Sequence, residues 1–247
     1  VKRMIKQIVL SATYRQTSRL TPQLARIDPE NILLARSPRF RLQGEFIRDT
    51  ALDLSGLLVE RIGGPSVKPY QPPNIWNEVS LNGGLRYKRD NGEKLYRRSM
   101  YTYWKRSAPM PNMLIFDAPT REKCMIQRPI TNTPLQALVT LNDPQFVEAA
   151  RSLGQRLIKE GGNDAASRID YGFKLALSRP ASEPEVKVIE RVLGDQLERF
   201  RDNPNKAKEF LAVGEVARDE TIDAVEHAAW MVVGQLLLNM DETLTRG

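Results

Sequence analysis

Residues 131–151 read TNTPLQALVTLNDPQFVEAAR and contain two helix starts ten residues apart. Thr133-Pro134-Leu135-Gln136 has the form of a capping box with proline at the first helical position. Asp143-Pro144 repeats the device and predicts a helix that runs to about residue 160. Two such starts so close together predict a helical hairpin or bundle.

The rest of the C-terminal half continues this pattern. Ser182-Glu183-Pro184-Glu185 is a second capping box, and Asn203-Pro204 begins another helix. The helix after Ser182 places its apolar residues on one side: Val186, Ile189, Leu193, Leu197 and Phe200. A last apolar helix is predicted over residues 222–240. Residues 131–247 are therefore predicted to form a helix bundle.

The N-terminal half is less regular. Helices are predicted over residues 2–17, from Thr21-Pro22, and over residues 38–62, where Gly63-Gly64-Pro65 stops the last one. Residues 65–130 are dense in proline, glycine and asparagine, and within them Leu95–Lys105 could form a strand or a buried irregular segment. The predicted fold is mainly α: one helical domain over 1–247, with helices in 1–64, an irregular, partly β insert at 65–130 and an acidic bundle at 131–247. Because the chain begins inside an amphipathic helix, we expect it to be a fragment of a longer protein.

Charge divides the chain into a basic and an acidic half. Residues 1–130 carry 23 Lys and Arg against 11 Asp and Glu, whereas residues 131–247 carry 14 against 19. Arginine supplies 16 of the 23 positive charges in the first half, and its planar fork suits carboxylate, sulfate or phosphate. The arginines could equally pair with acids inside the fold.

The low number of cysteine and histidine residues excludes several kinds of metal site. One cysteine and one histidine nearly exclude zinc or haem sites built from these residues, although a carboxylate site for a hard cation remains open. We expect no cofactor and no metal in this chain, a buried structural thiol at Cys124, and an ordinary core or surface histidine at His227. The apolar run from His227 to Met240 is too short to span a bilayer.

Three carboxylates recur at four-residue steps on the helix predicted over 38–62: Glu45, Asp49 and Asp53. Adjacent carboxylates repel unless a cation lies among them. The favoured interpretation is a face neutralised by Arg41 and Arg48, and the alternative is a bound metal or substrate amine. A general acid–base pair for glycoside cleavage is disfavoured, because its two carboxylates must face each other across a cleft.

The segment from Tyr96 to Arg106 interleaves basic and aromatic residues, as nucleic-acid and sugar sites do. A half-buried strand would show the same alternation, and this is the preferred interpretation. The candidate polar site consists of Arg41, Glu45, Arg48, Asp49, Arg97, Arg98, Asp117, Arg121, Glu122 and Asn132. No catalytic residue can be assigned among them, and whether the chain is an enzyme stays open.

Four ordered blocks resemble a known family. The first is Asp28-Pro29-Glu30-Asn31 with Arg36, Arg39, Arg41, Glu45, Arg48 and Asp49, and the second is Arg97-Arg98-Ser99-Met100-Tyr101 through Lys105-Arg106. The third is Phe116-Asp117-Ala118-Pro119-Thr120-Arg121-Glu122, and the fourth is Thr131–Leu138 with Leu141-Asn142-Asp143-Pro144 and Phe146-Val147. Together with Ala228-Ala229-Trp230 and Leu237–Glu242, they are similar to the C-terminal domain of unknown function in large planctomycete cytochrome-c-associated proteins. The resemblance implies an extracytoplasmic location, upstream domains of the same protein as partners, and haem c in an N-terminal part outside this chain. It carries over no catalytic residues.

Two functions from different classes follow. The first is a scaffold and recognition module for an anionic ligand, such as a sulfated or uronic polysaccharide. The second is part of the catalytic core of a haem-linked, carbohydrate-active oxidoreductase. Nucleic-acid binding is a weaker third, because the basic residues form no compact stripe and the family context points outside the cytoplasm.

Overall fold

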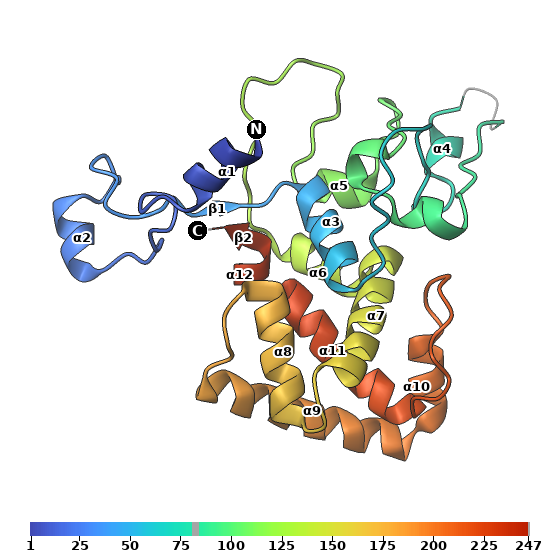
Figure 1. Ribbon diagram of the computed structural model, residues 1–247. Helices are drawn as coiled ribbons and strands as arrows, with labels where there is room; N and C mark the ends of the chain where they lie inside the picture. Colours follow the sequence, from blue (N-terminus) through green and yellow to red (C-terminus); the bar gives the residue numbers. More distant parts are fainter. Residues whose placement is uncertain (81–83, 247) are drawn as a thin grey trace. The chain divides into compact units, whose positions relative to one another are not determined.

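The protein is described by a computed structural model that covers residues 1–80 and 84–246. It divides into two compact units, Val1–Leu42 with Leu244–Gly247, and Gln43–Thr243. The described part is mainly helical, as predicted, with a small two-stranded sheet (Figure 1). None of its helices has the length and apolar character needed to cross a bilayer.

The first unit contains short elements. These are α1 (Lys2–Val9), α2 (Pro22–Ile27), β1 (Phe40–Arg41) and β2 (Thr245–Arg246), with the two strands antiparallel. α2 begins as predicted, because the Thr21 hydroxyl accepts a hydrogen bond from the N–H of Leu24. The helix predicted over 2–17 is wrong in length, since α1 ends at Val9 and turns follow. Each residue of α1 is solvent-exposed, so no packing extends it.

The second unit holds the remaining elements. They are α3 (Gly44–Leu54), α4 (Ile75–Glu78), the 3-10 helices η1 (Gly92–Tyr96) and η2 (Ser99–Tyr101), α5 (Pro111–Ile115), α6 (Pro134–Asn142), α7 (Pro144–Glu160), α8 (Ala165–Leu177), α9 (Glu183–Asp202), α10 (Pro204–Leu211), α11 (Ala224–Asn239) and α12 (Asp241–Leu244), the last of which ends at the boundary between the units.

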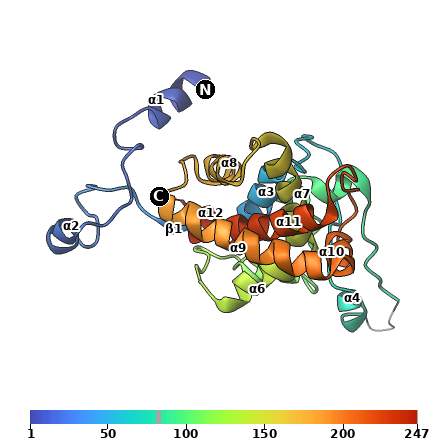
Figure 2. The ribbon, with the colours of Figure 1, turned by 90° about the horizontal axis from the view of Figure 1, so that it is seen from below.

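The core of the second unit lies between α7 and α11, and α8, α9 and α10 pack around them. Figure 2 shows α9 and α11 side by side, with α10 at one end. Close approach requires small residues: a Cβ on Gly154 would lie 2.7 Å from the nitrogen of Met231, and one on Gly234 would lie 2.5 Å from the carbonyl oxygen of Ala150. Trp230, with 2% of its surface exposed, fills the space beside this crossing.

Most predicted starts of the C-terminal helices are confirmed. The side chains of Asp143 and Asn203 cap α7 and α10 by accepting main-chain N–H groups. The Ser182 N–H donates to Glu185 in the capping box of α9, and the Glu185 carboxylate also accepts two hydrogen bonds from Arg179, at 2.9 and 2.7 Å. The capping box at Thr133 is wrong in detail, because the Gln136 side chain points to the carbonyl of Ile115 instead.

The helix predicted over 38–62 is much shorter in the structure. Residues before Gln43 are extended, and α3 ends at Leu54 because Gly56 adopts a φ of +75°. The N–H groups of Leu57 and Leu58 both turn back to the carbonyl of Leu52. Leu95–Lys105 takes the second of its two predicted forms, a buried irregular segment of 3-10 turns with isolated β-bridges to Val59 and Val67.

Candidate functional site

Arg48 of α3 is the centre of the polar cluster. Only 1% of this residue is exposed, and its guanidinium donates to the carbonyls of Leu95 (2.6 Å) and Arg97 (2.8 Å). It also donates to Ser99 Oγ and Gln145 Oε1, both at 3.1 Å. Burial lowers the pKa of Arg48 to about 10, which still leaves it charged at neutral pH. This side chain fastens the irregular segment to α3 and α7.

Arg97 performs a similar task for the turn before the insert. Its guanidinium donates to the carbonyls of Arg61 and Pro65, and it stacks 3.9 Å above the ring of Tyr101. A third hydrogen bond goes to the carbonyl of Gly63. Both terminal nitrogens of Arg97 thus donate to main-chain oxygens within the fold.

Two of the three carboxylates at four-residue steps on α3, Glu45 and Asp49, pair with basic side chains. Asp49 accepts the N–H of Ser99 at 2.7 Å and lies within 3.7 Å of Arg48 and 3.5 Å of Arg98. Glu45 pairs instead with Arg128, at 2.8 Å. The predicted neutralisation by Arg48 is therefore confirmed for Asp49, whereas Arg128 was not foreseen as a partner. Arg41 lies on β1, in the other unit.

The loop over residues 117–133 carries the remaining predicted residues. Asp117 accepts the N–H of Thr131 at 2.8 Å, which closes the loop at its base. Arg121 stacks 4.8 Å from the ring of Trp104. Glu122 and Asn132 are exposed on this loop. The loop as a whole is tied to α3 through the pair between Glu45 and Arg128.

Two expectations about single residues have definite outcomes. Cys124 is exposed, so the expectation of a buried thiol is wrong: its loop packs too little side-chain surface to cover it. His227 is a core histidine with 0% exposure, and its Nε2 lies 3.0 Å from the carbonyl of Arg151. Burial lowers the pKa of His227, so the neutral ring donates to that carbonyl at pH 7.

Of the predicted residues, Asp49 and Arg98 line one cavity. It has a volume of about 410 Å³, and Asp53, Glu60, Arg61 and Tyr101 contribute to its walls. Arg48 and Arg97 lie behind this cavity, where main-chain oxygens engage them. Among the described residues, no group of three or more His, Cys, Asp or Glu side chains is arranged to hold a metal ion.

A second and larger cavity, which we call the basic pocket, lies in the insert. Its volume is about 630 Å³, and its charged lining consists of Lys68, Lys88, Arg89, Asp90 and Lys94. The ring of Tyr103 forms a further part of the wall. Four basic side chains against one acid give this cavity a positive potential.

The acid and the arginine of the basic pocket are already engaged. Asp90 accepts the main-chain N–H of Lys68 at 2.8 Å. Arg89 pairs with Glu215 at 3.0 Å and lies 4.8 Å from the ring of Tyr70. No carboxylate among the described residues comes within salt-bridge distance of the ammonium groups of Lys68, Lys88 and Lys94. These three lysines therefore carry the unpaired charge of the pocket.

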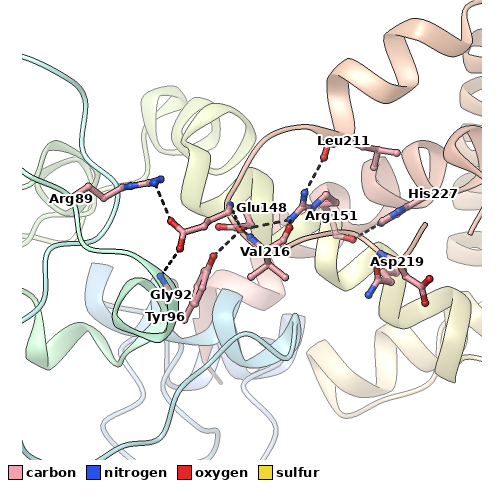
Figure 3. A network of polar contacts seen from close by, with 11 residues as sticks. Arg89, Gly92, Tyr96, Glu148, Arg151, Leu211, Val216, Asp219 and His227 are labelled. Carbon is pink, nitrogen blue, oxygen red and sulfur yellow. Dashed lines mark hydrogen bonds and ion pairs between the residues drawn. The ribbon is translucent and has the colours of Figure 1, made fainter. Parts of the chain in front are cut away.

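A buried carboxylate holds the rim of the basic pocket in place (Figure 3). Glu148 of α7, with 0% exposure, accepts the Tyr96 hydroxyl at 2.9 Å and the N–H groups of Glu215 and Val216 at 2.7 and 2.8 Å. Its Oε1 lies 3.6 Å from Arg151 Nη2. The Glu215 carboxylate in turn accepts the N–H of Gly92 and pairs with Arg89.

The phenols beside Glu148 are electrostatically perturbed. Burial raises the pKa of Tyr70 to about 12, and the nearby charge of Glu148 adds to the effect. Burial and the same carboxylate also raise the pKa of Tyr96. Both phenols are therefore neutral at physiological pH, so that Tyr96 can donate to Glu148.

The family described as "PSD1: Protein of unknown function (DUF1553)" matches residues 1–193. The chain belongs to this family. No curated protein and no solved structure matches it. The DUF1553 match includes α3, the basic pocket and Glu148, and it ends within α9. α11, which completes the core of this DUF1553 protein, lies beyond the matched residues.

The basic pocket of this DUF1553 protein was missed by the sequence analysis. Its lysines come from irregular segments, where no periodicity indicates which side chains share a face. A usable signal existed in the run from Lys88 to Lys94, which contains three basic residues within an insert rich in glycine and asparagine. The basic and aromatic segment from Tyr96 to Arg106 was noted, and Tyr103 of this segment does reach the pocket.

Proposed function

We propose that this chain is a non-catalytic recognition and scaffold module whose basic pocket binds an anionic ligand, namely a sulfated or uronic polysaccharide. The observation that supports the proposal is the group of three lysines, Lys68, Lys88 and Lys94, around one cavity of about 630 Å³, none of which has a carboxylate partner among the residues that the structure describes. Unpaired cations at one cavity raise the local concentration of anions and favour their binding.

The type of cation supports a ligand with sulfate or carboxylate groups spread along a chain. Ammonium groups are compact, strongly hydrated point charges that bind anions without a fixed bidentate geometry. Tyr103, which is 40% exposed, forms part of the wall of the same cavity. The guanidinium groups of Arg48 and Arg97, which would suit a planar partner, are occupied by main-chain carbonyls.

The wider context of the proposal rests on the resemblance of the sequence blocks. We propose that the module works in the cell envelope or outside the cell, next to upstream domains of the same protein that include a cytochrome-c-like domain. Haem would belong to that domain, and this chain would supply recognition of the ligand.

Titration of the purified chain with heparin, used as a sulfated probe, tests the proposal. Binding is expected at low salt and is expected to weaken steeply at about 150 mM ionic strength, because ion pairs of exposed lysines are screened. The double variant Lys88→Gln/Lys94→Gln should weaken binding about thirtyfold, from roughly 1 kcal/mol for each lysine.

Lys187→Gln is the matched control, since Lys187 is an exposed lysine of α9 outside the basic pocket. It should leave heparin affinity unchanged. Absence of salt-sensitive binding, or an equal loss in the Lys187 variant, would refute the proposed function.

The catalytic alternative has one observation in its favour. Asp49, Asp53 and Glu60 share the 410 Å³ cavity with Arg98 and Tyr101. Carboxylates, a guanidinium group and a phenol therefore line the same space. If this cavity is the working site, Asp49→Asn should alter turnover of a polysaccharide while heparin binding at the basic pocket stays unchanged. An Asp49→Asn variant that changes neither would remove the alternative.

A further inference from the structure

Two lysines from different segments converge on a single indole ring. The ammonium of Lys68 lies 5.5 Å from the ring centre of Trp76, and the ammonium of Lys105 lies at the same distance from that ring. The two nitrogen atoms are thus separated by no more than twice this distance. Lys68 also lies 5.3 Å from the ring centre of Tyr103. Trp76 therefore links a wall of the basic pocket to a cation outside its lining.

The rings restrict both lysines. Trp76 packs against Tyr87, with centroids 5.3 Å apart, and against Tyr103, with centroids 5.7 Å apart. Trp76 is 8% exposed, so the cluster is a fixed support rather than a mobile surface group. A cation held over an aromatic face loses less side-chain entropy when it binds an anion than a free lysine does.

We propose that the basic pocket is one part of a longer track for a linear acidic polysaccharide, in which Lys105, outside the lining of the pocket, supplies a second anchor beside Trp76. The inference rests on the proposed function and extends it from a single anion to a chain with repeated charges. One sulfate or carboxylate of the chain binds in the pocket near Lys88 and Lys94. A further anionic group along the same chain then meets the ammonium of Lys105.

The state of the rings favours a polysaccharide over single-stranded nucleic acid. Binding of single strands depends on aromatic faces that are open for base stacking. Here the indole of Trp76 is buried, and ammonium groups already lie over its ring and over that of Tyr103. The cluster thus presents positive charge with little stacking surface, and this suits a chain whose anionic groups, rather than its rings, are recognised.

Calorimetric titration with heparin di-, hexa- and dodecasaccharides tests the track. Affinity should rise with length until the chain covers both anchors and then stop rising. Lys105→Gln should leave the disaccharide affinity unchanged and weaken the dodecasaccharide about fivefold. Lys88→Gln should weaken both probes, and Lys187→Gln should weaken neither.

The outcomes separate the inference from the proposed function. If no heparin species binds, the proposed function itself fails. If heparin binds but affinity is independent of length, or if Lys105→Gln binds the dodecasaccharide normally, the track is refuted and the pocket remains. Equal or tighter binding of an oligothymidylate of matched charge would also overturn the choice of a polysaccharide.

Discussion

Replacement of Arg48 by methionine tests the role that the structure gives to buried arginine. The substitution retains an unbranched apolar stem but removes the donors to two main-chain carbonyls, those of Leu95 and Arg97, and to two side chains. The carbonyls cannot be removed by mutation, and each buried acceptor left without a donor costs about 1–3 kcal/mol. We expect the free energy of unfolding to fall by about 3–5 kcal/mol, within the range for breaking a buried charged network.

Two further variants make this estimate specific. Arg48→Lys keeps the charge, but an ammonium has three protons for four acceptors, so about half of the loss should remain. Arg98→Met removes the other arginine near Asp49. The Arg98 side chain is 50% exposed, and its Nε lies 3.5 Å from the Asp49 carboxylate. Its effect should stay below about 1 kcal/mol, as for exposed ion pairs.

Urea unfolding followed by circular dichroism at pH 7 measures all three variants, and hydrogen exchange of the amides between Leu95 and Ser99 localises the effect. The reasoning would be refuted if Arg48→Met lost less than about 1 kcal/mol, or no more than Arg98→Met. Such a result would mean that water reaches the carbonyls and that the 3-10 segment is not held by this side chain.

Three other predictions concern the loop over Glu148, the buried phenols and the capping box. Gly214→Ala places a Cβ 2.4 Å from the Glu148 side chain, at a backbone φ of +101°. It should lower the free energy of unfolding by at least about 2 kcal/mol more than Gly56→Ala, because Gly56 has a φ of +75° and no described atom within 4 Å of the added Cβ. Equal melting temperatures of the two variants would contradict this. Because the pKa of Tyr96 is raised in the folded state, its contribution to stability is lost as pH rises above 10. Tyr96→Phe should therefore make the free energy of unfolding, measured by urea titration, fall less with pH in the alkaline range. An unchanged dependence on pH would count against a buried neutral phenol. The hydrogen bonds that lower the pKa of Glu185 from 4.5 to about 2 stabilise the fold above pH 4.5 and are lost toward pH 2. Glu185→Gln should therefore lower the free energy of unfolding by about 1 kcal/mol at pH 7 and reduce its dependence on pH between 4.5 and 2. Equal pH dependence in the variant and the wild type would exclude this.

Helices that begin with a capping residue and a proline were predictable, and elements defined by contacts between distant residues were not. The starts at Asp143, Ser182 and Asn203 depend on a cap and a proline within three residues, which any reader of the sequence can see. α8 was not predicted, although Asp164 caps it and Ile169 and Phe173 form its buried face. No proline marks its start, and it lies between two stronger signals.

The ends of α3 show a different limit. The helix predicted over 38–62 was ended at Gly63-Gly64-Pro65, because Leu58 continues the four-residue spacing of Leu54. In the structure Leu57 and Leu58 fold back and pack against the cluster of Leu52 and Leu95. Apolar spacing cannot distinguish a longer helix from a turn that buries the same residues, and Gly56 was the available warning.

The candidate site was harder to predict than the helices, because a sequence does not show which groups a charged side chain will contact in the fold. Arg48 and Arg97 were chosen as candidates for a ligand, yet their donors meet main-chain carbonyls. Lys68, Lys88 and Lys94, which have no carboxylate partner among the described residues, lie in segments brought together by 3-10 turns and isolated bridges. Only the folded chain shows which of the two groups faces solvent.

The irregular insert itself explains this division between arginine and lysine. A segment with little regular helix or sheet leaves main-chain carbonyls without N–H partners, and buried carbonyls must find donors elsewhere. Arginine offers five donors on one rigid plane, so a single side chain can satisfy several carbonyls at once, as Arg48 does at Leu95 and Arg97. Lysine, a point charge on a flexible stem, suits the surface better. Part of the arginine surplus is therefore a structural requirement of the insert, and in the proposed function lysine carries the charge that meets the ligand.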